Sequence, residues 1–148
     1  MTTLGIDPAH AKPIAFAFRT NRMWTVVTLS PDAPADWYEL FLSAKRMGVA
    51  RIVIEDGFIG VNVKTGRALD QIRGGLAAVA KLAKLPVSMV APATWQTAML
   101  SQGDWTPKRT PEIEAQAKLR ARLETGRDVS NVDEAAAVCI AAWGDGQR

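Results

Sequence analysis

Apolar residues in the first third of the chain fall in short runs separated by turn residues, a pattern typical of β-strands. Asp7-Pro8 ends the first run, because proline has no N–H for a strand ladder and favours extended backbone before it. A polar connection at residues 20–22 joins the second and third runs as a hairpin. We therefore predict strands over residues 3–6, 13–19, 23–29 and 51–55.

A helical spacing of apolar residues begins in the fourth decade of the chain and dominates the second half. Trp37, Phe41 and Ala44 lie three or four positions apart, and Gly48 ends that helix. Pro92 suits the first turn of a later helix, and Gly126 stops another. The predicted helices cover residues 36–47, 69–82, 92–100, 111–125 and 131–143, with a buried-type strand over 86–91 and a polar loop over 101–110.

The order of these elements predicts the architecture. Three leading strands without crossovers imply an antiparallel meander, and later strands separated by helices imply parallel pairing. We expect an α/β fold with a five-stranded mixed sheet flanked by helices, formed by residues 1–148 as one domain.

Composition excludes several classes of protein. The chain has 148 residues, of which 48% are hydrophobic and 22% charged, which is ordinary for a globular protein. A lone cysteine, Cys139, excludes an intramolecular disulfide and a multi-cysteine zinc site, and its apolar neighbours predict a buried thiol. The lone His10 is more typical of a surface residue than of a ligand. Neither a long apolar run nor a signal-peptide pattern occurs, so we expect a cytoplasmic protein without membrane association.

Basic residues concentrate in one part of the chain, although the net charge is only +3. Residues 57–85 carry one acid, Asp70, among five basic residues: Lys64, Arg67, Arg73, Lys81 and Lys84. Such a surface suits a phosphate-bearing partner, and a solvated helix face is the alternative interpretation.

Two acids each end a predicted strand, Asp7 the first and Glu55 the fourth. If those strands are neighbours, both carboxylates emerge at one edge and repel each other unless a cation neutralises them. Asp133 and Glu134 open the last helix, followed by alanines that allow a close approach to the sheet. Converging acids make a two-metal phosphodiesterase site plausible. The alternative is that each acid only caps or solubilises its element.

Several motifs in this order resemble RuvC-type Holliday junction resolvases, members of the ribonuclease H-like superfamily. Gly5-Ile6-Asp7-Pro8 matches the opening strand of the family, and Glu55-Asp56-Gly57-Phe58 with Asn62 matches its next acid, phenylalanine and asparagine. Leu69-Asp70-Gln71-Ile72-Arg73-Gly74 resembles its helix start, and Glu134-Ala135-Ala136-Ala137-Val138 resembles its closing helix. The spaced Glu, Phe, Asn and Arg-Gly set is the most specific of these signals.

The resemblance implies a metal-dependent endodeoxyribonuclease that resolves Holliday junctions or other branched DNA by paired nicks. It also implies a homodimer, no organic cofactor, and the cytoplasm of a bacterium or phage-infected host; a phage or prophage version would suit the short chain. The implied metal ligands, for two Mg²⁺ or Mn²⁺ ions, are Asp7, Glu55 and Glu134, with Asn131 as a neutral ligand and Asp133 as a possible replacement. The implied DNA contacts are Phe58, stacked on an unpaired base, with Asn62, Lys64, Arg67 and Arg73.

The sequence departs from the family pattern in three places. The closing helix offers Asn131 and Glu134 where the family has two acids or a histidine and an acid, and the alternative register, Asp133 and Ala136, also loses an acid. Trp95-Gln96 stands where the family often has a lysine. Beyond it, Lys108, Arg109 and Lys118 are all candidates for a basic residue beside the DNA, and Trp105 could stack on a base or lie in a dimer interface.

Two other functions stay open on the sequence. A related nuclease that processes RNA shares the Gly-Ile-Asp-Pro opening. A non-catalytic junction-binding protein would account for the weakened acid pair at residues 131 and 134.

Overall fold

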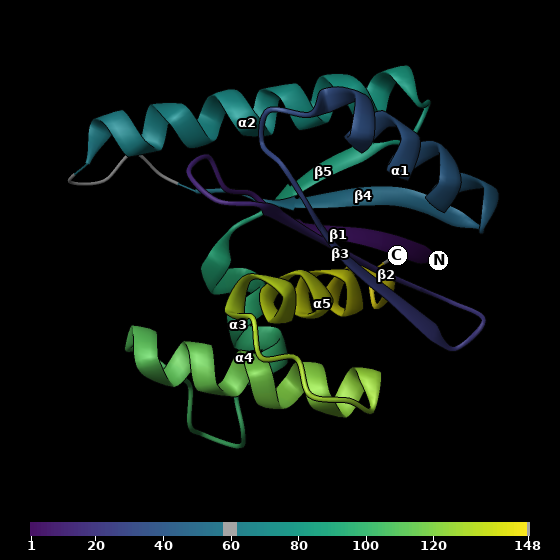
Figure 1. The fold of residues 1–148 in the computed structure, drawn as a ribbon. Coiled ribbons are helices and arrows are strands. Elements are labelled where there is room, and N and C mark those ends of the chain that lie inside the picture. Colours follow the sequence, from purple (N-terminus) through teal and green to yellow (C-terminus); the bar gives the residue numbers. More distant parts are fainter. Residues whose placement is uncertain (58–61, 148) are drawn as a thin grey trace.

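One mixed sheet with the strand order β3-β2-β1-β4-β5 forms the centre of the molecule (Figure 1). The structure is a computed structural model that describes residues 1–57 and 62–147. The strands are β1 (Thr2–Asp7), β2 (Ile14–Thr20), β3 (Met23–Leu29), β4 (Val49–Glu55) and β5 (Val87–Val90).

The pairing of the strands confirms the predicted topology. Strands β1, β2 and β3 form an antiparallel meander, whereas β1 pairs with β4, and β4 with β5, in parallel. The β2–β3 connection places Asn21 and Arg22 at positive φ, 51° and 67°, as a tight two-residue hairpin requires. Because β1 and β4 are parallel neighbours, their carboxyl ends lie side by side.

Helices cover both faces of the sheet (Figure 1). Helix α2 begins at residue 63, earlier than predicted, because the Asn62 side chain caps it by accepting the N–H of Thr65 at 3.0 Å. Helices α1 (Pro34–Arg46) and α2 (Val63–Leu82) lie on one face, and α3 (Pro92–Leu100), α4 (Thr110–Thr125) and α5 (Val132–Asp145) lie on the other.

The prediction of a buried strand at residues 86–91 is wrong in its burial. Strand β5 is an edge strand that pairs with β4 along one side, and Ser88 and Met89 are exposed. The apolar run at this position therefore reflects only the two ends of the strand, Val87 and Val90, which are more buried.

Strand β1 separates two apolar clusters because successive side chains of a strand point to opposite faces. Leu4 and Ile6 are fully buried in the cluster beneath α1 and α2. On the other face, Gly5 meets α5 so closely that a Cβ there would collide with the backbone of Ala137 and Ala141. Small residues on both sides thus let α5 lie directly on the strand that ends in Asp7.

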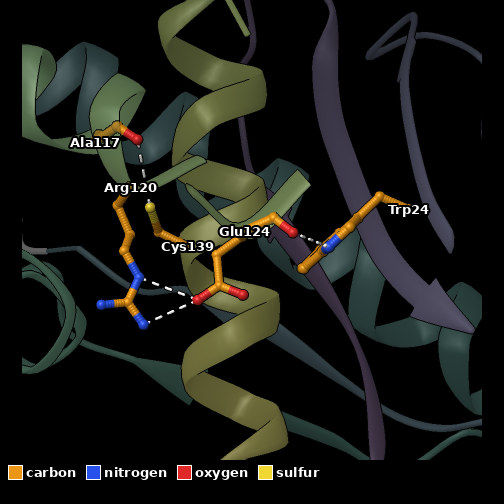
Figure 2. A network of polar contacts seen from close by, with 5 residues as sticks. All are labelled: Trp24, Ala117, Arg120, Glu124 and Cys139. Atoms are coloured by element: carbon orange, nitrogen blue, oxygen red, sulfur yellow. Dashed lines mark hydrogen bonds and ion pairs between the residues drawn. The ribbon is translucent and has the colours of Figure 1, made fainter. Parts of the chain in front are cut away.

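Hydrogen bonds join α4 to strand β3 and to helix α5 (Figure 2). The Trp24 indole on β3 donates to the main-chain oxygen of Glu124 at 3.0 Å, and Arg120 donates twice to the carboxylate of Glu124, at 2.9 and 3.0 Å. The Cys139 thiol on α5 donates to the main-chain oxygen of Ala117 at 3.7 Å. Burial raises the pKa of Cys139 to about 12, which confirms the buried thiol expected from the sequence.

Candidate active site

Three acids from distant parts of the chain gather at the carboxyl edge of β1 and β4. Asp7 ends β1, Glu55 ends β4, and Asp133 lies in the first turn of α5. Burial raises the pKa of Asp7 well above its ordinary value, and the charges of Glu55 and Asp133 and a hydrogen bond with Asp133 raise it further. We call Asp7, Glu55 and Asp133 the acid cluster.

Two local features place Asp133 in the acid cluster. The contact between Gly5 and the alanines of α5 holds the helix on β1. The Asn131 side-chain oxygen then caps α5 by accepting the N–H groups of Asp133 and Glu134 at 2.8 and 3.1 Å. The structure thus gives Asn131 a capping role, and it brings Asp133 into contact with Asp7.

A lysine that the sequence analysis did not select provides the cation of the cluster. Lys12, in the connection between β1 and β2, places its Nζ 2.8 and 3.0 Å from the two carboxylate oxygens of Asp133. The lysine side chain is 58% exposed, and that of Asp133 19%. No sequence pattern marks a lysine five positions after Asp7. Its contact with Asp133 depends on how α5 packs against the connection between β1 and β2.

Glu55 is fixed at both its main chain and its carboxylate. Arg73 Nε donates to the main-chain oxygen of Glu55 at 2.9 Å. The indole Nε1 of Trp95 donates to Glu55 Oε2 at 2.7 Å, and Trp95 itself is only 2% exposed. Burial raises the pKa of Glu55, while the Trp95 hydrogen bond and the Arg73 charge lower it. Trp95, whose position in the sequence marked only a departure from the family pattern, therefore contacts this site directly.

Arg73 differs from the surface phosphate contact expected from the sequence. Its guanidinium is buried against Glu55, and its Nη1 pairs with Asp70 at 3.0 Å. A Cβ at Gly57 would lie 2.6 Å from Arg73 Nη2, so glycine leaves the room that this guanidinium occupies. The buried contacts favour a role in shaping the site over a direct contact with DNA.

Helix α2 borders the acid cluster and carries two of the predicted DNA contacts, Lys64 and Arg67. A pocket of about 360 Å³ beside Asp7, Lys12 and Asp133 is also lined by Thr65 and Leu69 of α2. Lys64 and Arg67 are exposed on the same first turns of α2. Lys64 and Arg67 thus place exposed positive charge on the helix that borders this pocket.

The remaining candidates stay predictions. Arg109 pairs with Glu112 at 2.8 Å, Lys108 is exposed, and Lys118 lines a hollow near Asp128. Glu134, next to Asp133 in the first turn of α5, is half-buried. The exposed His10 lines the pocket beside Asp7. Trp105 is 42% exposed in its loop. Phe58 lies outside the described residues.

The donor set of the acid cluster fits a hard divalent cation. In residues 1–57 and 62–147, no three His, Cys, Asp or Glu side chains are already arranged to ligate a metal ion. Mg²⁺ usually takes only one or two protein carboxylates and completes its shell with water and substrate phosphate. Burial and, after it, the charges of Glu55 and Asp133 raise the pKa of Asp7, and a bound cation would relieve both effects.

Comparison with solved structures identifies the fold. The structure of T. thermophilus RuvC in complex with Holliday junction substrate superposes with a TM-score of 0.69 over 95% of this chain and 90% of that one, at 18% sequence identity. The chain has the ribonuclease H-like fold of RuvC. A second Thermus thermophilus RuvC structure gives a TM-score of 0.68 at 18% identity, over 95% of this chain and 91% of that one. The yeast mitochondrial Holliday junction resolvase Ydc2 gives 0.50 at 12% identity, over 96% and 76% of the two chains.

The RuvC likeness confirms the fold class and, at the level of the fold, the resemblance found in the sequence. No protein-family model matches the sequence, and no curated protein matches it significantly. Among the described residues, every helix is too short or too polar to cross a bilayer.

Proposed function

We propose that the chain is a metal-dependent, structure-selective endodeoxyribonuclease that cuts four-way or other branched DNA. The observation that carries the proposal is the convergence of Asp7, Glu55 and Asp133 at one sheet edge of a RuvC fold. Solved structures with this fold are described as RuvC with a Holliday junction substrate and as a Holliday junction resolvase.

Asp7 and Asp133 would hold a divalent cation between them, with Glu55 as a further ligand and Glu134 as a reserve acid. Mg²⁺ or Mn²⁺, two ions in the full site, would stabilise the attacking and leaving oxygens of the scissile phosphate. Arg73 and Trp95 hold Glu55 in place. Lys12 balances the charge of Asp133 and lies where it can meet the phosphate group once a metal ion takes that carboxylate.

The DNA would cross the acid cluster and the first turns of α2. Lys64 and Arg67 are exposed cations on these turns of α2 and would bind backbone phosphates without reading sequence. Phe58 would stack on an unpaired base at the centre of the junction. Two nicks on symmetric strands imply a homodimer, because each monomer carries one such cluster.

The direct test is cleavage of a synthetic four-way DNA junction with Mg²⁺ or Mn²⁺, with a linear duplex of the same sequence as control. Paired, symmetric nicks in the junction alone support the proposal. Asp7→Asn should remove cleavage while a gel shift still detects binding to the junction.

Three results would redirect the proposal. Tight binding of the wild type without cleavage in either metal indicates a non-catalytic junction binder. Cleavage of structured RNA but not of the junction indicates an RNA-processing nuclease. Loss of junction binding in Asp7→Asn together with cleavage would show that Asp7 supports the fold rather than the chemistry.

A further inference from the structure

The carboxylate of Glu55 has one oxygen engaged by a buried tryptophan. Trp95 Nε1 lies 2.7 Å from Glu55 Oε2, a short distance typical of a charge-assisted hydrogen bond. The indole has a single N–H and only donates, and Trp95, at 2% exposure on α3, has little room to turn. The bond therefore favours one position of Oε2.

The backbone of Glu55 is held as well, so the side chain cannot easily move away from Trp95. Arg73 Nε binds the main-chain oxygen of Glu55 at 2.9 Å. Glu55 also pairs with Val90 at the end of the β4–β5 ladder. Within the described residues, the one hydrogen bond to this side chain goes to Oε2, and Oε1 accepts none.

Resting on the proposed function, we infer that Trp95 favours ligation by Glu55 through Oε1 alone and so makes the cation site prefer Mg²⁺ or Mn²⁺ to Ca²⁺. Ca²⁺ takes six to eight oxygens and often grips a carboxylate through both of them. Mg²⁺ requires a nearly octahedral shell, for which a single oxygen from Glu55 is the better ligand. Binding through both oxygens would place the cation on Oε2 beside the indole N–H, whose positive end opposes it.

The test measures metal binding rather than cleavage. Trp95→Phe removes the indole donor but keeps an aromatic ring. Mg²⁺, Mn²⁺ and Ca²⁺ are titrated into the whole metal-free chain by calorimetry, with thermal stabilisation as a second readout. We expect the ratio of Ca²⁺ to Mg²⁺ affinity to rise about tenfold in Trp95→Phe, because losing a hydrogen bond to a charged group is worth about that much.

Trp37→Phe is the matched control. Trp37 is 3% exposed and donates its own indole hydrogen bond to Ser30 O at 2.9 Å, on the α1 side of the sheet. Its replacement removes the same chemical group and should leave the ratio of metal affinities unchanged. An unchanged ratio in Trp95→Phe, or an equal rise in both variants, overturns the inference.

A second pair of variants keeps Trp95 and so does not depend on how Trp95→Phe folds. In Glu55→Gln, the indole must face the amide oxygen, which turns the amide NH₂ towards the cation site. Glu55→Gln should therefore lose as much Mg²⁺ affinity as Glu55→Ala. If Glu55→Gln binds Mg²⁺ clearly better than Glu55→Ala, the amide oxygen faces the site and the inference is wrong.

The outcomes separate the inference from the function on which it rests. A wild type that binds no divalent cation overturns both. A wild type that binds Mg²⁺ and cuts junctions, with an unchanged metal ratio in Trp95→Phe, overturns the inference alone.

Discussion

The contact between helix α5 and strand β1 has an acid at each end, Asp145 at one and Asp7 at the other. Positive groups and a donor surround Asp145, whereas further acids surround Asp7. At one end, Asp145 accepts the N–H of Thr3 at 2.7 Å; burial raises the pKa of Asp145, while this hydrogen bond, Arg19 and the N-terminal amine lower it. At the other end, burial again raises the pKa of Asp7, and the nearby acids raise it further.

This difference matches the proposed function, in which the Asp7 end binds the cation and the Asp145 end joins the helix to the strand. The surroundings of Asp145 supply the positive charge and donors that a buried carboxylate needs, so that end only joins the helix to the strand. Around Asp7, the sequence instead places more acid, and Lys12 is the cation that lowers its pKa. A surplus of buried negative charge is costly for folding and is relieved by a bound cation.

Replacing the acid at each end gives the largest contrast. Asp7→Asn should reduce cleavage by about 10³-fold or more, because metal ions contribute several kcal/mol to such a reaction. Its thermal stability without metal should rise, since a crowded buried charge is removed. Initial rates of junction cleavage and a melting curve measure the two effects.

Asp145→Asn is the control from the other end of the same contact. It should retain wild-type cleavage, because Asp145 lies at the opposite end of the contact from the acid cluster. Equal loss of cleavage in both variants would contradict the division between the two ends.

Gly5→Ala tests whether the approach of α5 to β1 assembles the acid cluster. The added methyl collides with the backbone of Ala137 and Ala141, so α5 must shift. Overpacking of this kind costs about 1–3 kcal/mol, and the shift should also move Asp133 away from Asp7 and reduce cleavage. Urea denaturation and the cleavage rate report the two effects.

Gly74→Ala in α2 is the matched control, because a Cβ there meets nothing within 4 Å. It should leave cleavage unchanged and stabilise the helix by about 0.4–1 kcal/mol. Full cleavage activity in Gly5→Ala would show that the acid cluster tolerates movement of α5.

The raised pKa of Asp7 predicts how stability depends on pH when metal is absent. Below its ordinary value of 3.8, Asp7 is protonated in both the folded and unfolded chains. As pH rises towards the raised folded pKa, only the unfolded chain releases this proton, so stability falls. Denaturation measured from pH 3.8 upwards should show this fall, and it should be weaker in Asp7→Asn. A fall of the same size in Asp7→Asn would assign it to other groups.

Lys12→Met gives the smallest effect. The ion pair with Asp133 is partly exposed and is worth about 0.2–1 kcal/mol, so the metal-free variant should melt slightly below the wild type. Added Mn²⁺ should stabilise Lys12→Met more than the wild type, because Asp133 has lost its resident cation. Lys118→Met, an exposed lysine on α4, is the control, and equal Mn²⁺ stabilisation in all three proteins would refute this role of Lys12.

Local patterns predict most of the fold and the first half of the site. The strand that ends at Asp7-Pro8 and the apolar run that ends at Glu55 are visible in the sequence, and parallel pairing brings their ends together. Burial of β5 is predicted wrongly because an edge position depends on the whole sheet and not on four residues.

Contacts between remote side chains are the part that the sequence does not reveal. Lys12 and Asp133 are 121 positions apart, and Trp95 and Glu55 are 40 apart. In the sequence, Arg73 is one of several basic residues on a predicted helix. Its burial depends on the packing of α2 against the end of β4. Such contacts have no period or spacing from which they could be predicted.

The long separation between Asp7 and Asp133 also has a consequence for synthesis of the protein on the ribosome. The first strand emerges early, but α5 can pack on Gly5 only after residues 132–145 have also been made. A growing chain therefore carries Asp7 and Glu55 before it has Asp133. A product that ends before α5 would lack both this acid and the helix that holds it.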